Sequence, residues 1–471
     1  MTMLPIAAAA LAIVIQNQTP LQGAPRDSAS KQAVLWQGDT VEVRGEKLDY
    51  LQVYDHRRER AGYIKATQVR SVSLEAANAR ELLSVVRFLR DTPGAEALGV
   101  SYAAAYLKAV ASADLTAEPL DALGVMADRL AQRVSTNQIK SNETALAAHL
   151  EVVAQYGVNM KSFDVEGSIR VCYDGDMFRR VLAMPSASAG QLARAALGLT
   201  RPECMDPGAG PTARHERDLW RAAVLDLVPA DGLTDEERSH LHVRRAGVWA
   251  AIAFSQSRRG EPTKDAGERA LRELAAVTKS DLTDNDLLEY GESAVRVGAS
   301  RWAAEPAGKP AGKLWVQTVA GEPGETCVLL EDAKHDAQHP LMRRCTYATV
   351  WIASASSNAA GTALALAVQP LDVWRELWLF RSTPAGWTLA VIPPGTDNTH
   401  LGYLEFAGWV PGADRMLAAR EVKVNGGMRR RFEVISTASL AVEHFATTPE
   451  YLSVFMRWQE PRWKRLSVAL R

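Results

Sequence analysis

The chain has 471 residues, with 54 basic and 55 acidic side chains and a formal net charge of -1. At roughly 150 residues per domain, this length predicts two to four domains. The balance of charge leaves no basic excess to neutralise phosphates, which argues against nucleic-acid binding. An apolar fraction of 47% and a charged fraction of 23% are typical of a soluble globular protein.

The first feature along the chain is an apolar run at residues 4–15, LPIAAAALAIVI. The run is too short to span a bilayer and matches the hydrophobic region of a secretory signal. Ser28-Ala29-Ser30 offers small residues for cleavage, so we predict that residues 1–30 are a signal peptide or a disordered leader. The expected location is then the periplasm or the extracellular space. A nonpolar tail on a cytosolic protein is the alternative, because no Lys or Arg precedes the run.

Residues 31–73 show the pattern of short strands. Apolar residues such as Val41, Val43 and Val53 alternate with polar ones, which is the signature of half-buried strands. Gly38-Asp39 provides a turn between two of these runs. Short strands in so small a segment favour a small β-barrel.

Residues 48–70 read LDYLQVYDHRRERAGYIKATQVR: a strand through Val53, a charged hairpin, and then Gly62-Tyr63-Ile64. This stretch resembles a bacterial SH3-like domain, with Tyr50 and Tyr63 where that family usually has tryptophans. The family often binds cell-wall peptides or partner proteins, so the resemblance implies a binding surface here. The aromatic residues are equally candidates for the barrel core. The candidate ligand-binding residues are Trp36, Tyr50, Tyr54, Asp55, Arg57, Arg58 and Tyr63.

Residues 74–303 show helical periodicity. Leu82, Val86 and Leu89 recur at the spacing of one helix face. Thr234 and Glu237 form the pattern of a capping box at the start of another helix. No fixed repeat period is present, so the sequence predicts an all-α domain of irregularly stacked helices.

Residues 304–312 are rich in Pro, Gly and Ala and predict a linker. Beyond them, residues 313–471 contain many short strand patterns separated by turns. Trp351, Trp409 and Trp458 each precede a short turn and a strand-like run, a repeat that resembles the blades of a β-propeller. Residues 453–458 are among the predicted strands. Too few units are present to close a ring, so we expect a partial, propeller-like stack of antiparallel sheets.

The predicted fold class is therefore multidomain α+β. It comprises a small SH3-like β-barrel, then an all-α helical domain, then a β-rich propeller-like antiparallel domain.

The four cysteines fall into two local pairs, which predict the disulfides Cys172–Cys204 and Cys327–Cys345. Free thiols are the alternative for both pairs. For the second pair, a metal site with His335 and His339 is another alternative, because those two histidines would share a face of a helical turn.

The sequence contains no nucleophile elbow, metalloprotease helix, phosphate loop or dinucleotide fingerprint. We therefore predict a non-enzymatic protein of the cell envelope, without cofactor, metal or transmembrane span, that binds peptidoglycan or an envelope protein. One alternative is a periplasmic protein–protein interaction scaffold. Another is an enzyme of a class without short motifs, for which Asp174, Asp176 and Glu405 would be available carboxylates.

Overall fold

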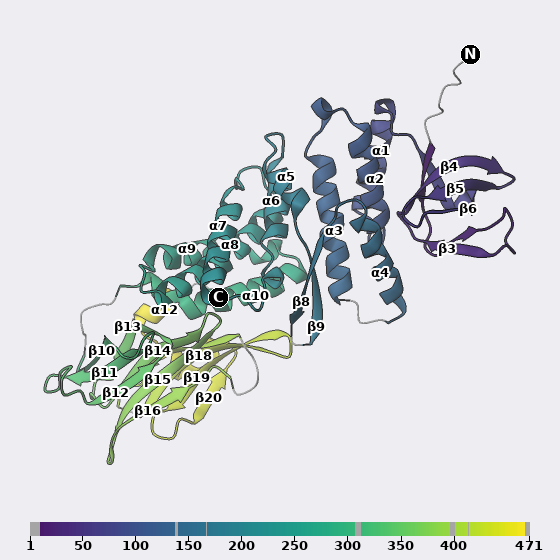
Figure 1. Cartoon of the computed structure of the whole chain (residues 1–471). Helices are drawn as coiled ribbons and strands as arrows, with labels where there is room; N and C mark the ends of the chain where they lie inside the picture. Colours follow the sequence, from purple (N-terminus) through teal and green to yellow (C-terminus); the bar gives the residue numbers. More distant parts are fainter. Residues whose placement is uncertain are drawn as a thin grey trace. The chain divides into compact units, whose positions relative to one another are not determined.

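The computed structural model describes residues 10–136, 140–165, 167–306, 312–395, 401–412 and 414–466. An antiparallel sheet comes first, a mainly helical region follows, and further sheets come after it, in the order that the sequence predicts (Figure 1). The chain divides into two compact units. The first contains the residues up to 209 together with 224–233, and the second contains 210–223 together with the residues from 234 onward.

The first unit begins with a seven-stranded antiparallel sheet in the order β3-β2-β6-β5-β4-β1-β7. Its core lies on one face and includes Leu35, Val41, Val53 and Ile64. In the described part of the chain the edge strands β3 and β7 do not pair with each other, so this antiparallel sheet does not close into the small β-barrel that the sequence predicts. The strands are β1 (Ala10–Val14), β2 (Thr19–Gln22), β3 (Lys31–Leu35), β4 (Thr40–Lys47), β5 (Tyr50–Asp55), β6 (Arg60–Lys65) and β7 (Val69–Val72).

Two strands of this sheet come from the segment assigned to a leader. Strand β1 lies inside the sheet between β4 and β7, and Ala12, Ile13 and Val14 are buried. A short continuous apolar run fits a fully buried strand as well as it fits a signal sequence. Cleavage near Ser30 would remove β1 and β2, so a leader boundary at residue 30 does not match this fold. The beginning of the apolar run, residues 4–9, lies outside the described residues.

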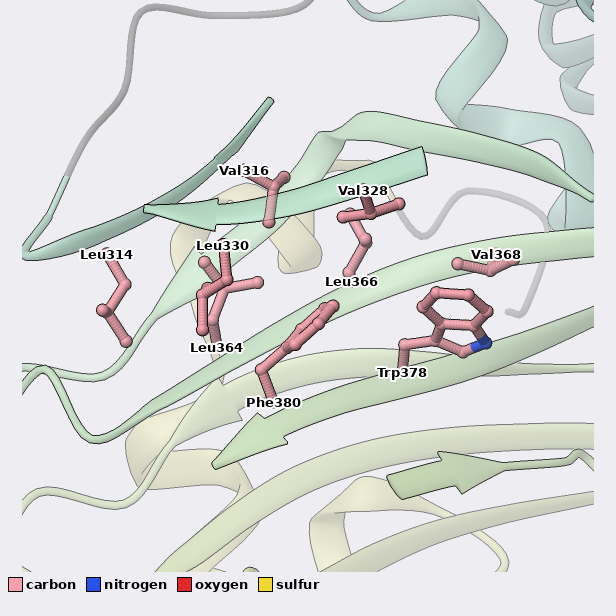
Figure 2. Packing of buried hydrophobic residues seen from close by; sticks show 9 residues of the cluster. All are labelled: Leu314, Val316, Val328, Leu330, Leu364, Leu366, Val368, Trp378 and Phe380. Atoms are coloured by element: carbon pink, nitrogen blue, oxygen red, sulfur yellow. The ribbon is translucent and has the colours of Figure 1, made fainter. Parts of the chain in front are cut away.

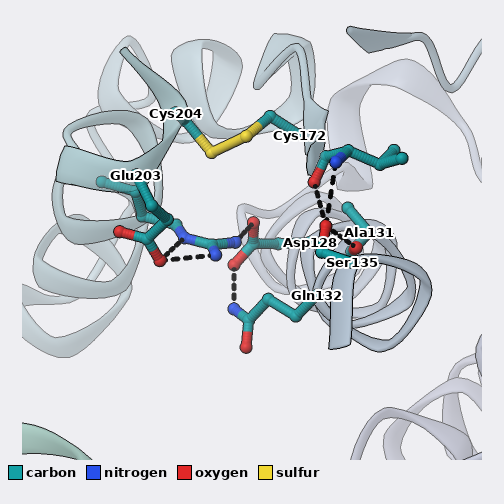
Figure 3. Close-up of a disulfide and its surroundings, with 9 residues drawn as sticks. Asp128, Ala131, Gln132, Ser135, Cys172, Glu203 and Cys204 are labelled. Atoms are coloured by element: carbon teal, nitrogen blue, oxygen red, sulfur yellow. Dashed lines mark hydrogen bonds and ion pairs between the residues drawn. A yellow bond between two sulfur atoms is a disulfide. The ribbon is translucent and has the colours of Figure 1, made fainter. Parts of the chain in front are cut away.

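Helices and a hairpin complete the first unit. The stripe of Leu82, Val86 and Leu89 is buried, as predicted. The disulfide between Cys172 and Cys204 joins strand β9 to the turn at residues 202–204 and confirms that pairing (Figure 3). The elements are α1 (Ala79–Arg90), α2 (Glu96–Ala109), α3 (Glu118–Thr136), α4 (Lys140–Ala154), β8 (Met160–Val165), β9 (Ser168–Tyr173), α5 (Asp176–Leu182) and α6 (Ala189–Leu199).

Helix α7 (Pro211–Asp226) crosses the division between the units, and α8 (Asp235–Arg258), α9 (Lys264–Ala275) and α10 (Asp284–Ser300) belong to the second. The predicted capping box at Thr234 is present. Helix α10 packs on the large C-terminal sheet, with Val295 and Ala299 against Tyr403. The predicted boundary between helical and β-rich domains therefore falls inside one compact unit. Ala304, the first residue of the predicted linker, is buried, and residues 307–311 lie outside the described residues.

The β-rich part contains a three-stranded sheet and an eight-stranded sheet. Their facing side chains form a hydrophobic core in which Val328 and Leu330 meet Leu366, Trp378 and Phe380 (Figure 2). The strands are β10 (Leu314–Ala320), β11 (Thr326–Asp332), β12 (Met342–Thr346), β13 (Thr349–Ser357), β14 (Ala363–Leu371), β15 (Trp374–Thr383), β16 (Gly386–Ile392), β17 (Gly402–Trp409), β18 (Arg415–Val424), β19 (Gly427–Ser436) and β20 (Val442–Ala446).

This part is not a propeller. Strand β17 pairs in parallel with β15, through Trp374 with Gly402 and Arg375 with Tyr403, so two would-be blades merge into one sheet. The predicted strand at 453–458 is also wrong, because α11 (Ser453–Trp458) and α12 (Pro461–Leu466) are helices. Phe455 and Trp463 pack on the sheet, so tertiary packing overrides the local strand pattern.

Candidate functional site

Two acidic residues and one arginine form a buried network at the end of strand β5. Arg58 lies between Asp55 and Asp39, with N–O distances of 2.8 and 3.2 Å. Both carboxylates are about 3% exposed. They also accept backbone N–H groups, Asp39 from Trp36 at 2.9 Å and Asp55 from Arg57 at 3.0 Å. The network fastens the β5–β6 hairpin to the turn before β4.

The same network reaches helix α4 and the residues after it. Gln155 donates to Asp39 at 3.2 Å, and the hydroxyl of Tyr156 donates to the carbonyl of Gly38 at 2.7 Å. Gly38 has a φ of +96°, and a Cβ there would collide with the backbone of Ala97. The close approach of this turn to Ala97 therefore needs glycine. Arg57 pairs with Glu151 of α4 at 3.5 Å.

Three of the predicted binding residues, Asp55, Arg57 and Arg58, are therefore engaged in joining the sheet to α4. Trp36 takes part in the same junction, where its ring meets His149 edge-on at 6.5 Å.

Two further candidates, Tyr50 and Tyr63, lie on strands β5 and β6. Tyr50 is 4% exposed, and its hydroxyl donates to Asp27 at 2.5 Å. That hydrogen bond, with burial as the second cause, raises the pKa of Tyr50 to about 12. Lys65 holds the same carboxylate at 2.8 Å. Tyr63 is half-buried and pairs with Gln52 across the sheet. The interpretation of the aromatics as packing residues therefore holds for Tyr50.

Tyr54 differs from the other candidates because it lies in an exposed cluster. We call Glu42, Arg44, Tyr54 and His56 the β4–β5 surface, after the strands that carry it or end beside it. The Arg44 guanidinium lies 4.1 Å from the centre of the Tyr54 ring, and the His56 ring meets Tyr54 edge-on at 4.9 Å. Glu42 pairs with Arg44 at 3.2 Å and with His56 at 2.6 Å.

The charges of this surface are arranged around one carboxylate. Hydrogen bonds from Arg44, and then from His56, lower the pKa of Glu42, and the bond to Glu42 raises the pKa of Arg44. The side chains of Arg44 and His56 are 45% and 66% exposed. The surface thus presents to solvent a cation held on an aromatic face and an imidazole, while the Glu42 side chain between them is 19% exposed. Groups of these types interact with other molecules by stacking, ion pairing and hydrogen bonding.

The sequence interpretation missed Glu42, Arg44 and His56. The sequence contained only a weak signal for the first two, because strand alternation would place Glu42 and Arg44 on one face. In the structure a bulge between Val43 and Gly45 interrupts that alternation at Arg44, and the ion pair brings the two side chains together. Glu42 is also directly opposite Tyr54 in the sheet register, which the sequence does not disclose.

The three carboxylates considered for an enzyme form hydrogen bonds and ion pairs with other residues. Asp174 accepts the backbone N–H of Asp176 at 3.0 Å, and Asp176 pairs with Arg180 at 3.0 Å. Glu405 is buried in the second unit between Arg375 and Arg301. Asp174 and Asp176 belong to the first unit and Glu405 to the second, and each has a partner within its own unit.

The Cys327–Cys345 pair is disulfide-bonded, as predicted. His335 and His339 lie in the loop between β11 and β12 and not on a helical turn. His335 bonds to Asp332 at 2.8 Å, and the side chain of His339 is 85% exposed. The alternative of a metal site required both histidines on one face of a helical turn, and this loop does not have that geometry.

The two disulfides indicate a non-reducing environment. Among the described helices, none combines the length and the apolar character that a bilayer crossing requires. Comparison of the chain with protein-family models, curated proteins and solved structures finds no match. The fold and the site therefore define a class only: a disulfide-bonded protein of mixed sheets and helices, with an exposed aromatic and charged surface on its first sheet.

Proposed function

We propose that the chain is an exported, non-enzymatic protein of the cell envelope whose β4–β5 surface binds a cell-wall peptide. The observation that carries this proposal is the Arg44–Tyr54 stack on an exposed face, flanked by His56. The two disulfides support the compartment, because such bonds persist where thiols are not kept reduced.

The chemistry of the surface suits a short peptide with free charged ends. The Arg44 side chain is 45% exposed and that of Glu42 is 19% exposed, and an ion pair that water reaches adds little to stability. A ligand carboxylate therefore replaces Glu42 on Arg44 at little cost, which frees Glu42 for an ammonium group of the same ligand. The Tyr54 ring then packs on the aliphatic part between the two charges.

Sedimentation of the purified chain with cell-wall sacculi tests the proposal. We expect the wild-type chain to sediment with sacculi, and the Arg44→Ala and Tyr54→Ala variants to stay in the supernatant. Arg80→Ala is the matched control, because Arg80 is an exposed arginine on helix α1 and its loss changes the net charge equally. Sedimentation that is unchanged in Arg44→Ala and Tyr54→Ala, or equally weakened in Arg80→Ala, contradicts the assignment of the surface.

A further inference from the structure

A second cluster of reactive groups lies at the start of the three-stranded sheet. Cys327 and Cys345 are directly opposite each other on β11 and β12 and form the disulfide. Glu325 precedes β11. One ligand atom from each of these three residues lies within 4.8 Å of the other two, and no other such group of His, Cys, Asp or Glu occurs in the described part of the chain.

The turn beside these residues leaves space for them. A Cβ at Gly321 would overlap Glu325 Oε2 and would lie 2.9 Å from Cys327 Sγ. The backbone N–H of Glu322 donates to Glu325 Oε2 at 3.2 Å and fixes the direction of the carboxylate. The backbone N–H of Gly321 donates to the carbonyl of Glu325 at 3.1 Å. Glycine at 321 therefore keeps open the space that the carboxylate and the sulfur share.

The guanidinium group of Arg343 lies beside the buried sulfur of Cys327. Arg343 Nη2 donates to Cys327 Sγ at 3.4 Å. Cys327 is 0% exposed, whereas Cys345 is partly exposed. An attacking thiolate therefore reaches Cys345 first, and the departing thiolate forms on Cys327 next to the guanidinium. A stabilised leaving thiolate makes exchange faster.

We propose that Glu325, Cys327 and Cys345 form a latent site for a zinc-type divalent cation, which opens when a dithiol reduces the disulfide. One thiolate of the reductant attacks Cys345 Sγ, the Cys327–Cys345 bond breaks, and Cys327 leaves as a thiolate. The second thiol of the reductant then resolves the mixed disulfide and releases Cys345. The chain gains two electrons, the dithiol becomes a disulfide, and the cation takes the place of the two thiol protons.

Ligand type, spacing and charge agree with this site. In tetrahedral zinc sites with Zn–S bonds of 2.3 Å, ligand atoms lie roughly 3.8 Å apart, which the present cluster reaches with small movements. Two thiolates and one carboxylate carry three negative charges, and a divalent cation with Arg343 supplies three positive ones. Three protein ligands leave a fourth position for water.

The other disulfide provides an internal control. The carboxylate next to it in sequence, Glu203, is engaged with Arg201 at 2.6 Å, and Arg201 also pairs with Asp128 (Figure 3). Cys172 and Cys204 do not belong to a group of three candidate ligands in the described residues. Reduction of this second disulfide should therefore create no comparable site.

Cobalt(II), added alone to the full chain after reduction by a phosphine without oxygen, tests the proposal. We expect one equivalent to bind with thiolate-to-cobalt charge-transfer absorption, and none to bind to the oxidised chain. Cys345→Ser should abolish the absorption, and Glu325→Gln and Gly321→Val should weaken binding at least roughly tenfold. The Cys172→Ser/Cys204→Ser variant should bind as the wild type does.

Alkylation mapping and circular dichroism accompany the titration, to show free thiols at 327 and 345 and an intact fold. Free thiols without cobalt absorption overturn the proposal. So does absorption that survives Cys345→Ser, or that is unchanged in Glu325→Gln. Loss of the strand signal on reduction also overturns it, because the site needs β11 and β12 to stay paired.

Discussion

The two units contain ion networks of the same size and opposite sign. In the first unit, Arg58 lies between two carboxylates, Asp39 and Asp55. In the second, the carboxylate of Glu405 lies between two guanidinium groups, those of Arg375 and Arg301. Each network has three charged groups, so one charge has no side-chain counter-ion, and each keeps that charge largely away from solvent. They differ in access to water, because the Arg58 side chain is 20% exposed, whereas the side chains of Glu405, Arg375 and Arg301 are all 6% exposed or less.

In both networks, backbone groups balance the charge that has no side-chain counter-ion. Arg375 donates to the carbonyl oxygens of Gly298 and Ala299 at 2.8 and 3.3 Å, near the carboxyl end of helix α10, where carbonyl groups carry a partial negative charge. In the first unit, backbone N–H groups of Trp36 and Arg57 point at the two aspartates instead. In each junction, the sign of the uncompensated charge is opposite to the partial charge of the backbone groups that face it.

The largest expected effect is in the fully buried network. Glu405→Gln keeps the shape of the side chain and leaves two buried guanidinium groups without a counter-ion. Breaking a buried pair in this way costs about 3–5 kcal/mol. Urea unfolding of the second unit measures the loss. Glu292→Gln, in the more exposed pair with Lys423 at 2.5 Å, should cost less than about 1 kcal/mol. Similar losses in both variants would contradict the distinction by burial.

An intermediate effect is expected at the partly exposed network. Arg58→Met leaves Asp39 and Asp55 without their shared cation, but both keep hydrogen bonds from backbone groups and water reaches the hairpin. We expect a loss of about 1–3 kcal/mol in the free energy of unfolding of the first unit. A loss as large as that of Glu405→Gln would show that solvent access does not separate the two networks.

The pH dependence of the first unit sharpens the comparison further. His149 is 4% exposed, and its Nε2–H donates to Asn17 Oδ1 at 2.8 Å. Burial, and then Arg133, lowers the pKa of His149, while Glu96 and Asp39 act in the opposite direction.

A folded-state pKa below the unfolded value means that His149 contributes stability above about pH 6.5, which is lost as pH falls toward the folded pKa. The slope for one proton is at most about 1.4 kcal/mol per pH unit. Urea unfolding between pH 7.5 and 5 should show this slope in the wild-type chain and lose it in His149→Gln. The same slope in both proteins would exclude His149 as its source.

The smallest stability effect is expected at the β4–β5 surface. Arg44→Ala removes an ion pair that water reaches and should lower the free energy of unfolding less than Arg58→Met does. Circular dichroism during urea unfolding measures it. A loss comparable with that of Arg58→Met would mean that Arg44 holds the sheet together and is not free to meet a ligand.

The sequence predicted the parts of this structure that local patterns determine. Helical stripes such as Leu82, Val86 and Leu89, the capping box at Thr234 and both disulfides are confirmed. Each depends on residues close together in the chain, where spacing translates directly into geometry.

The predictions that were wrong concern features that depend on pairing between residues far apart in the chain. The apolar run at Ala10–Val14 is a strand only because β4 and β7 lie on either side of it. The parallel pairing of Trp374 with Gly402, which prevents separate blades, leaves no local pattern. Likewise, Arg58 looked like a ligand contact because its partner Asp39 lies 19 residues away in the chain, and Asp55 is held by the same guanidinium.

The central claim is that Arg44 and Tyr54 form a peptide-binding surface, while Asp55 and Arg58 join the sheet to a helix. Isothermal titration with a soluble cell-wall peptide, on the wild-type chain and on Arg44→Ala, tests it most directly. The proposal predicts saturable binding to the wild type and at least a roughly tenfold weaker affinity, about 1.4 kcal/mol, in the variant. Absence of binding to the wild type, or equal affinity in both proteins, would contradict it.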